Sequence, residues 1–506
     1  MSAPHASPAA RLPGTPLYTA AGLRAIEAAA AAHDGDTAVL MQRAGQAAWR
    51  VVGAHWLHAR QLHVVCGPGD NGGDGYVLAR LAQAAGQVVR VVRLSAHAPR
   101  TALAGAACDA FVQAGGRVDI FGPGALRDAD LIVDALYGIG LSRAVEGESA
   151  ELVEAVAASG ADVLALDVPS GVDSDRGHVA GVAIRATRTL QFLGAHLGLQ
   201  TGDGPDHAGA LLLDALAIDP AFGDAATPAA RRVDVGDLGH WLHPRPRNSH
   251  KGRAGRVLCI GGDHGMGGAV LLAAEAALRC GAGLVRVATR AAHVASLLAR
   301  CPEVMASAVG TDAALADLLT HADVVALGPG LGQGAWGHGL YADVLECGVP
   351  LVLDADALNL LASRPRPLPP GTILTPHPGE AARLLACTTA EVQRDRPHAV
   401  RRLAERHGAV VVLKGAGTLV CAPGATPWLI AAGNPGMAAG GMGDVLTGVI
   451  AALRAQRLVP EAAAVCGALL HAAAGDRATH VGGERGLRPI DLMAELRPLA
   501  NPGATP

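Results

Sequence analysis

The segment of this 506-residue sequence with the most chemical content is glycine-rich and lies near its end, at residues 433–447. Three glycines, the last of them Gly443, stand directly before Asp444, and residues 445–453 are predicted to form a helix. A glycine-rich turn that leads into a helix presents backbone N–H groups that hold a phosphate. An aspartate there can accept the proton of a hydroxyl that attacks the phosphoryl group. Asp444 is therefore a candidate catalytic base, and its alternative role is a plain helix N-cap.

A second glycine-rich segment, residues 66–75, lies between a predicted strand and a helix predicted from about residue 76. Its glycines fit the G-x-G-x-x-G dinucleotide fingerprint, and they would let the backbone approach a ligand. The acidic residue expected about 20 positions further on is missing, which weakens the dinucleotide interpretation. The segment also carries Asp70, Asn71 and Asp74, more polar groups than a plain phosphate-binding turn needs.

Two aspartates of the first half, Asp134 and Asp167, end apolar stretches that are predicted to be strands. Ligands of parallel sheets bind at the carboxyl ends of the strands, where both side chains are expected. Asn71, Asp134 and Ser170 would together offer one carboxylate and two neutral oxygens to a hard cation. With so few carboxylates, one monovalent ion fits better than two divalent ions. A cap or turn role is the alternative for each aspartate.

The sequence contains only two lysines, Lys251 and Lys414, among 41 basic residues, and both precede a glycine. A chain that otherwise uses arginine is expected to keep lysine where a compact ammonium group is needed. His377 lies in the segment Thr-Pro-His-Pro-Gly-Glu and is either a structural hydrogen-bonding histidine or a ligand contact. The phosphate-binding pattern G-x-x-x-x-G-K-[ST] is absent, which excludes a P-loop.

Short apolar strands alternate with helical stretches along both halves of the chain, which indicates parallel sheets with helices on both faces. The alternation lapses at residues 219–234, where Pro, Ala, Gly and Arg prevail. We therefore predict two α/β domains, residues 1–227 and 233–506, with a Rossmann-like three-layer sandwich first.

Composition narrows the class of protein. Half of the residues are hydrophobic, the net charge is −4 and aromatic residues make up 3%. These values argue against a disordered chain and against binding to nucleic acid. No apolar run is long enough to span a bilayer and no secretory signal is recognisable, so no membrane partner is expected. Nine scattered cysteines indicate free thiols in a reducing compartment, so we predict a cytoplasmic protein. We also predict a homo-oligomer.

The motifs of the first half resemble the NAD(P)H-hydrate epimerase domain. The resemblance rests on Gly-Asp-Asn-Gly-Gly-Asp-Gly, Asp-Ala-Leu-Tyr-Gly-Ile-Gly-Leu and Leu-Asp-Val-Pro-Ser-Gly-Val-Asp, and covers residues 18–216. It implies K⁺ binding by Asn71, Asp134 and Ser170, and Asp167 is our candidate for acid–base catalysis. Ile139 and Asp70 stand where that family often has Thr and Asn, so a hydroxyl contact at position 139 would be lost. The resemblance implies hydrate binding by Asp70, Asn71, Gly72, Gly73, Asp74, Gly138, Ile139, Gly140, Leu141, Ser142, Arg143, Ala144 and Asp167.

The motifs of the second half are similar to the ribokinase-like superfamily and, within it, to the ADP-dependent NAD(P)H-hydrate dehydratases. The resemblance covers residues 235–499 and rests on His-Lys-Gly, Thr-Pro-His-Pro-Gly-Glu, Leu-Lys-Gly-Ala-Gly-Thr and the glycine-rich segment at 433–447. Ala439 stands where that family commonly has Ser. The resemblance implies ADP as co-substrate, and we add Mg²⁺ as a cofactor. The implied adenine nucleotide contacts are Lys414, Gly415, Ala416, Gly417, Thr418 and Gly443, and the implied hydrate contacts are Ala269, Gly330, His377 and Asp444.

Both resemblances imply one task, the repair of NAD(P)H that has been hydrated at C6 of its nicotinamide ring. The first domain would interconvert the R and S hydrates, and the second would dehydrate the S form with ADP, giving AMP and phosphate. The main alternative is a ribokinase-like small-molecule kinase, for a vitamin or a sugar, with a nucleotide-sensing N-terminal domain. A purely regulatory nucleotide-binding protein and an NAD(P) oxidoreductase are further alternatives, and the missing ribose-binding acid counts against the oxidoreductase.

Overall fold

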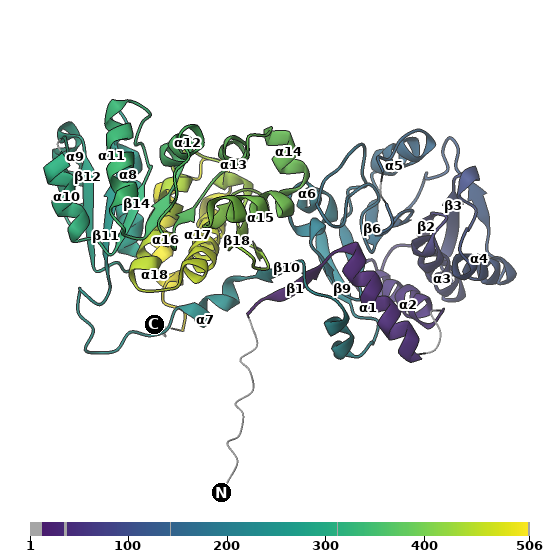
Figure 1. Ribbon diagram of the computed structural model, residues 1–506. Helices are drawn as coiled ribbons and strands as arrows, with labels where there is room; N and C mark the ends of the chain where they lie inside the picture. The colour runs from purple at the N-terminus through teal and green to yellow at the C-terminus, as the bar shows by residue number, and fades with distance from the viewer. Residues whose placement is uncertain (1–12, 35–37, 142, 311, 504–506) are drawn as a thin grey trace, which may run out of the picture. The chain divides into compact units, whose positions relative to one another are not determined.

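The computed structural model describes residues 13–34, 38–141, 143–310 and 312–503. They form two compact α/β units (Figure 1). The first unit, which we call the N-unit, consists of Pro16–Ala230 together with Gln393–Arg396. The second, the C-unit, consists mainly of Arg231–Val392 and the chain from Pro397 onward.

The N-unit is built around a seven-stranded sheet in the order β4-β3-β2-β5-β6-β7-β9, and every neighbouring pair is parallel. A short parallel pair, β1 and β8, lies apart from this sheet. The strands are β1 (Thr15–Tyr18), β2 (Gln61–Cys66), β3 (Val88–Arg93), β4 (Val118–Ile120), β5 (Leu131–Ala135), β6 (Asp162–Leu166), β7 (Arg188–Phe192), β8 (Ala195–His196) and β9 (Ala210–Asp214). The helices are α1 (Ala20–Asp34), α2 (Ala38–His55), α3 (Asp70–Ala84), α4 (Ala102–Gln113), α5 (Glu148–Ser159) and α6 (Gly204–Ala208).

Alternate side chains of the central strands enter two separate hydrophobic cores. Val64 packs with helices α2 and α3, whereas its neighbour Val65 packs with Leu152 and Val156 of α5. The period of two is that of a strand covered on both faces. The predicted Rossmann-like three-layer sandwich is thus confirmed.

The C-unit sheet follows the order β13-β12-β11-β14-β15-β16-β17-β18-β19-β10. It is parallel from β13 to β17, β18 is antiparallel to both of its neighbours, and β10 is parallel to β19. The strands are β10 (Ala230–Val233), β11 (Arg256–Ile260), β12 (Leu284–Thr289), β13 (Met305–Ala308), β14 (Val324–Leu327), β15 (Leu351–Leu353), β16 (Ile373–Leu374), β17 (Val410–Leu413), β18 (Leu419–Cys421) and β19 (Trp428–Ile430). The helices of this half of the chain are α7 (Leu238–Trp241), α8 (Gly267–Arg279), α9 (Ala291–Arg300), α10 (Asp312–Thr320), α11 (Ala335–Glu346), α12 (Ala355–Ser363), α13 (Pro378–Leu385), α14 (Thr389–Arg394), α15 (Arg396–His407), α16 (Met442–Ala455), α17 (Pro460–Gly482) and α18 (Leu492–Leu499).

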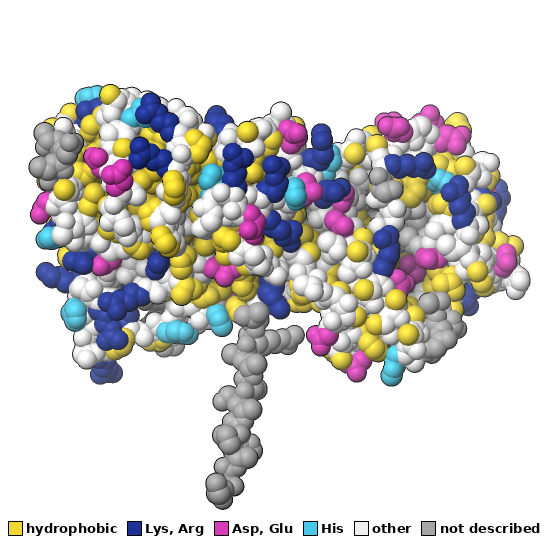
Figure 2. Space-filling model, in the orientation of Figure 1, with side chains coloured by type: hydrophobic (Ala, Val, Ile, Leu, Met, Phe, Trp, Pro, Cys, Tyr) yellow, Lys and Arg dark blue, Asp and Glu magenta, His cyan; other side chains and the backbone are white. Residues whose placement is uncertain are grey.

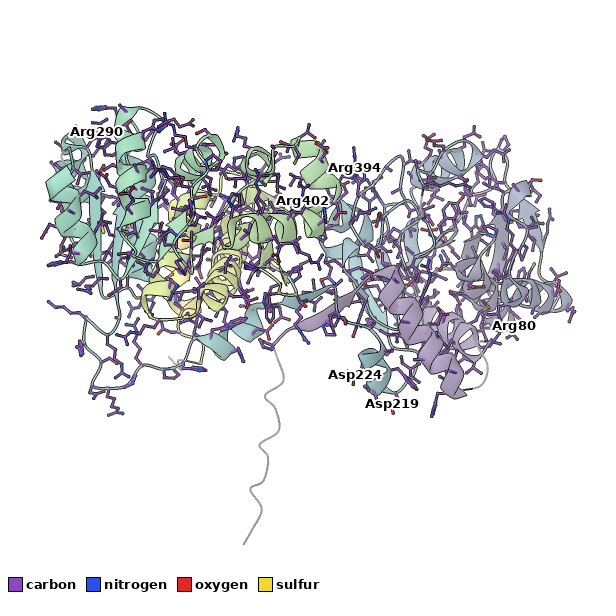
Figure 3. All side chains as sticks on the ribbon, viewed as in Figure 1. Arg80, Asp219, Asp224, Arg290, Arg394 and Arg402 are labelled. Carbon is purple, nitrogen blue, oxygen red and sulfur yellow. The ribbon has the colours of Figure 1, made fainter. Side chains whose placement is uncertain are left out.

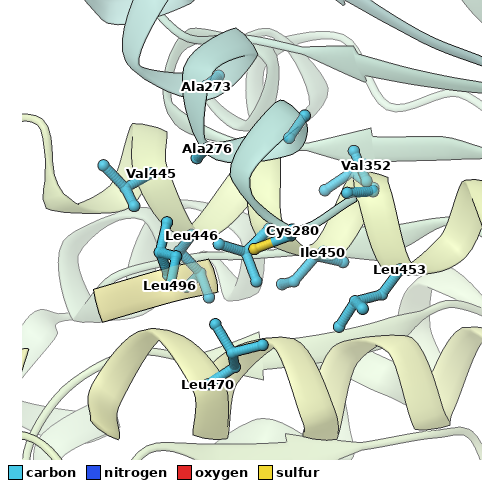
Figure 4. Close-up of a cluster of buried hydrophobic side chains, with 14 of the residues drawn as sticks. Ala273, Ala276, Cys280, Val352, Val445, Leu446, Ile450, Leu453, Leu470 and Leu496 are labelled. Atoms are coloured by element: carbon cyan, nitrogen blue, oxygen red, sulfur yellow. The ribbon is translucent and has the colours of Figure 1, made fainter. Parts of the chain in front are cut away.

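Helices α8, α16, α17 and α18 form the main core of the C-unit with one face of its sheet (Figure 4). Ile450 and Leu470 are fully buried there, and burial of such a side chain contributes about 1.5–3 kcal/mol. At Gly448 of α16, a Cβ atom would lie 2.0 Å from the carbonyl oxygen of Ala273 in α8. Glycine is therefore required for α8 and α16 to pack backbone against backbone.

The predicted starts of two helices are wrong in detail. Helices α3 and α16 begin at Asp70 and Met442, several residues before the predicted starts, because their glycines are packed inside the first helical turns. The stretch 219–234, where the strand–helix alternation lapses, contains β10, a four-residue strand too short to show an apolar pattern. The N-terminal part of the N-unit contributes two helices, α1 and α2. Among the described residues, no helix combines the length and the apolar character that crossing a membrane requires.

Candidate active sites

The first candidate site lies where the strand order of the N-unit reverses. The chain passes from β2 to β3 on one side of the sheet and later adds β5 and β6 on the other side. The loops after β2, β5 and β6 therefore meet at the carboxyl edge, where sheets of this type bind ligands. Gly67 and Gly72 have a packing role there, because a Cβ at either position would collide with a backbone carbonyl, that of Leu136 or of Gly67.

Asp134 and Ser170 are brought together directly. Asp134 Oδ1 accepts a hydrogen bond from Ser170 Oγ at 2.6 Å, and Oδ2 accepts one from the Ser170 N–H at 2.8 Å. The Leu136 N–H also donates to Asp134, at 3.1 Å. Burial raises the pKa of Asp134 to about 6, although these hydrogen bonds oppose the shift. A buried carboxylate in this position would be stabilised by a cation.

Asn71 lies in the first turn of α3 with both polar atoms of its side-chain amide buried, and no described residue hydrogen-bonds to them. Its side chain lies against Gly138, where an added Cβ would be 3.4 Å from the amide carbon. A buried amide without a partner costs free energy, so Asn71 is poised to bind a ligand or an ion. This fits the predicted grouping with Asp134, although the structure gives no direct contact between the two.

Asp167 follows β6 and has φ of +66°, a conformation that residues with a side chain rarely adopt. One carboxylate oxygen lies 2.9 Å from Nε2 of His196, whose side chain is completely buried. The other accepts a hydrogen bond from the Ile139 N–H at 3.3 Å. The Ile139 contact uses the backbone, so it does not need the hydroxyl of a threonine. Strain combined with fixed hydrogen bonds is common at functional residues.

Acidic side chains crowd around Asp167. Burial, together with the charges of Asp167, Asp70 and Glu27, raises the pKa of Asp74 well above its usual range. Glu27, in α1, has a raised pKa because of burial and the charges of Asp70 and Asp167. An acid with a raised pKa beside a hydrogen-bonded carboxylate is an arrangement that general acid–base catalysis uses.

The remaining predicted contacts lie in the β5–α5 loop or in α3. Gly73 packs in α3 against Met41. Leu141 closes a turn onto the Gly138 carbonyl, and Arg143 is exposed. Ser142 lies outside the described residues. In the same loop are Gly138, Ile139, Gly140 and Ala144.

The second candidate site is organised by a buried ion pair. Asp354, directly after β15, accepts hydrogen bonds from Lys414 Nζ at 2.8 Å and from Thr447 Oγ1 at 2.9 Å. Burial alone would raise the pKa of Asp354, but Lys414 and the hydrogen bonds bring it below its usual value. Asp354 is thus an ionised counter-ion that holds the ammonium group at the carboxyl edge. Gly443 leaves room for the pair, because a Cβ there would lie 3.2 Å from Lys414 Nζ.

Two further carboxylates share this lysine. Burial raises the pKa of Asp444 to about 7, Asp354 adds to the shift and Lys414 opposes it. Burial likewise raises the pKa of Glu380 to about 7, and the charge of Lys414 again opposes the shift. Asp444 is in the first turn of α16, and the N-cap position is occupied by Gly441, so the alternative of Asp444 as N-cap is wrong. An acid of pKa near 7 can act as a base at neutral pH.

His377 is the N-cap of α13. Its Nδ1 accepts a hydrogen bond from the Gly379 N–H at 3.0 Å, while Glu380 accepts one from the His377 N–H at 2.8 Å. Burial and the charge of Lys414 lower its pKa, so the ring is neutral. Half of the side chain is exposed and remains accessible to a ligand.

Ala269 and Gly330 lie side by side, since a Cβ on Gly330 would be 3.2 Å from the Ala269 Cβ. The loops after β11 and β14 meet where the strand order of the C-unit reverses; Ala269 lies in the first turn of α8, just after the first loop, and Gly330 lies in the second. An ion pair between Asp263 and Arg290, at 2.7 Å, ties the first of these loops to the residue after β12. The predicted nucleotide loop follows β17 and contains Lys414, Gly415, Ala416, Gly417 and Thr418.

Sequence reasoning missed four residues of these sites: His196, Asp354, Glu380 and Thr447. Asp354 could have been found, because it ends a strand in the same way as Asp134 and Asp167. Glu380 and Thr447 lie in the quoted segments at 375–380 and 433–447, but nothing local assigned them a role, and His196 carried no local signal.

The two α/β units define a two-part enzyme. Its second part, the C-unit, holds the site around Lys414 and is ribokinase-like. A family model described as NAD(P)H-hydrate dehydratase matches residues 257–497, and one described as YjeF-related protein N-terminus matches residues 37–198. A crystal structure of a ribokinase-like superfamily protein from Enterococcus faecalis matches with a TM-score of 0.50 at 30% identity. It covers 54% of this chain and 95% of that protein.

Full-length relatives are bifunctional NAD(P)H-hydrate repair enzymes. That of Coxiella burnetii is 45% identical over 96% of this chain and 100% of its own length. That of Escherichia coli is 44% identical over 92% and 90%. The chain belongs to the family of bifunctional NAD(P)H-hydrate repair enzymes.

Proposed function

We propose that this protein epimerises the R and S forms of NAD(P)H-hydrate and dehydrates the S form to NAD(P)H with ADP as phosphoryl donor. The observation that carries the proposal is the position of Asp444 in the first turn of α16, beside the Lys414–Asp354 pair. Epimerisation belongs to residues 1–227 and dehydration to residues 233–506. We expect the enzyme to act in the cytoplasm. We also expect a homo-oligomer, and light scattering of the purified protein tests this oligomeric state.

Dehydration begins when Asp444 accepts the proton of the C6 hydroxyl. The hydroxyl oxygen then attacks the β-phosphorus of ADP, the bond to the bridging oxygen breaks, and AMP leaves. Lys414 and the N–H groups at the start of α16 stabilise the charge on the transferring group. Phosphate departs with the C6–O bond pair, and loss of a proton from C5 restores the ring double bond. Lys414 to Thr418 and Gly443 hold the nucleotide, while Ala269, Gly330 and His377 contact the hydrate.

Mg²⁺ fits this site as an ion that arrives with ADP. Asp444, Glu380 and Asp354 outnumber the single ammonium of Lys414, and burial with this excess of carboxylates raises the pKa values of Asp444 and Glu380. A divalent cation would offset that charge when bound, and Mg²⁺ is usually held by substrate phosphates with one or two carboxylates.

Epimerisation requires reversible breakdown of the C6 hemiaminal. Asp167 is the proposed base, positioned by His196, and Asp74 is the proposed acid because its pKa is raised. Asn71, Asp134 and Ser170 would hold K⁺, which supplies positive charge near the substrate. The fit is supported by the buried, unpartnered amide of Asn71 and the buried carboxylate of Asp134.

The experiment is incubation of the protein with mixed hydrate epimers, first without and then with ADP. Without ADP, an R-enriched mixture should equilibrate; with ADP, both epimers should return to reduced nicotinamide while AMP forms. Recovery of only the S form would remove the epimerase assignment. No recovery, with phosphorylation of a vitamin or sugar by ATP instead, would favour the small-molecule kinase.

A further inference from the structure

A cavity of about 1100 Å³ lies in the C-unit at the amino ends of β11 and β12. We call it the amino-edge cavity. One wall is the segment between α7 and β11, and the others come from the ends of α8, α9, α16 and α18. Asp354, Lys414 and the glycine-rich turn lie at the carboxyl edge of the same sheet, so the amino-edge cavity is separate from the dehydration site.

The lining of this cavity is strongly basic, although the whole chain has a net charge of −4. Two carboxylates, Glu275 and Glu303, accompany the basic side chains and leave an excess of four positive charges. Figure 2 shows Lys and Arg side chains gathered over the segment between α7 and β11. The basic residues of the lining are Arg245, Lys251, Arg253, Arg279, Arg300 and Arg497.

Internal ion pairs neutralise little of this charge. Glu275 is the partner of both Arg279 and Arg300, at 3.8 and 3.7 Å, and these distances are long for an ion pair. Arg245 donates to the Gly281 carbonyl at 2.6 Å and to the side-chain oxygen of Gln456, which fixes the segment over the cavity. A cluster of like charges held at one cavity costs free energy unless an anion binds there.

The cavity also has an apolar wall. Trp241, Leu242, Leu278 and Leu453 line it together with the basic groups. An aromatic ring beside arginines suits a base that stacks and a phosphate chain that pairs with guanidinium groups. The volume exceeds what a single phosphate ion needs.

We propose that the amino-edge cavity is a second nucleotide site, which binds the phosphate chain of a nucleoside polyphosphate. Two helices connect it to the dehydration site. Helix α8 carries Ala269 in its first turn and Arg279 at its end, and α16 carries Asp444 in its first turn and Leu453 near its end. A ligand that shifts the ends of these closely packed helices would change the affinity for substrate at their starts.

The test is the stoichiometry of ADP binding to the full-length protein at low ionic strength, measured by equilibrium dialysis. Two equivalents per chain are expected. The triple variant Lys251→Gln/Arg300→Gln/Arg497→Gln should bind one, because each lost charged contact weakens binding roughly tenfold. The control variant Arg364→Gln/Arg402→Gln/Arg406→Gln removes the same charge from exposed positions outside the cavity and should still bind two (Arg402 is labelled in Figure 3).

Competition experiments identify which part of the nucleotide the amino-edge cavity binds. Inorganic tripolyphosphate should displace one of the two ADP equivalents, and adenosine alone should displace it poorly. One equivalent of ADP on the wild-type protein overturns the proposal, as do two equivalents on the triple variant. Displacement by adenosine but not by tripolyphosphate also overturns it.

Discussion

The dehydration rate should depend on pH through Asp444. The pKa of about 7 means that the ionised fraction rises from about one-tenth at pH 6 to about nine-tenths at pH 8. Because a general base works only when ionised, and kcat/KM reports the ionisation of the free enzyme, kcat/KM should rise about tenfold over this interval. Glu380 titrates over the same range, so a variant is needed to assign the effect.

Asp444→Asn provides that assignment. The side chain keeps its size but cannot accept a proton, and loss of a general base lowers the rate by about 10²–10⁴. Helix α16 loses only the favourable charge in its first turn, worth about 0.3–1 kcal/mol. The residual rate should no longer follow the ionisation of position 444, and melting should change little. Asp317→Asn, at an exposed carboxylate of α10, is the matched control and should keep the wild-type profile.

The assay determines kcat/KM with purified S-hydrate and ADP below their KM values and follows the return of reduced nicotinamide absorbance. Epimerisation of R-hydrate is measured on the same sample and should persist in Asp444→Asn. A wild-type profile that is flat from pH 6 to pH 8 would refute the assignment of Asp444 as the base. So would an Asp444→Asn variant that folds and retains nearly full rate.

Three further predictions concern other parts of the chain. Lys414→Met should raise the pKa of Asp444, because the charge of Lys414 lowers it. The rising limb of the pH profile of dehydration should therefore move to higher pH, and ADP should bind more weakly. A rising limb that does not move contradicts this prediction. Asn71→Ala should abolish the increase in melting temperature that K⁺ gives the protein. Melting in a bulky organic cation should be almost unchanged, because the Asn71 amide has no described hydrogen-bond partner to lose. Stabilisation by K⁺ equal to that of the wild type would remove Asn71 from the ion site. Gly448→Ala should destabilise the C-unit by about 1–3 kcal/mol or more in urea unfolding, because its Cβ would meet the Ala273 carbonyl, whereas Gly268→Ala, with open space around it, should be nearly neutral.

Local signals made much of the fold predictable from the sequence. The alternation of apolar strands with helices correctly indicated parallel sheets, and Asp134, Asp167 and Asp444 fell at strand or helix ends because such positions are local in the chain. The starts of α3 and α16 were misplaced because glycine was interpreted as a loop residue. In α3, Gly72 and Gly75 instead allow the helix to approach the backbone of the preceding loop and the strands beneath it.

Pairings across the chain were not predictable. His196 is 29 residues from Asp167, and Lys414 is 60 residues from Asp354. Each pair meets only because the strand order places the ends of distant strands at one edge, and periodicity within a segment carries no information on strand order.

The roles of two aspartates show why this matters for function. Asp354 and Asp444 both stand at ends of elements and would be equal candidates for the base. Packing of α16 against β15 gives Asp354 the Thr447 hydroxyl, and the end of β17 gives it the Lys414 ammonium, so it stays ionised as a counter-ion. Asp444 is partly buried near that charge and accepts no hydrogen bond from the described residues, and desolvation raises its pKa to about 7. In the proposed mechanism, the division of labour between counter-ion and base is therefore set by which carboxylate hydrogen-bonds to the lysine.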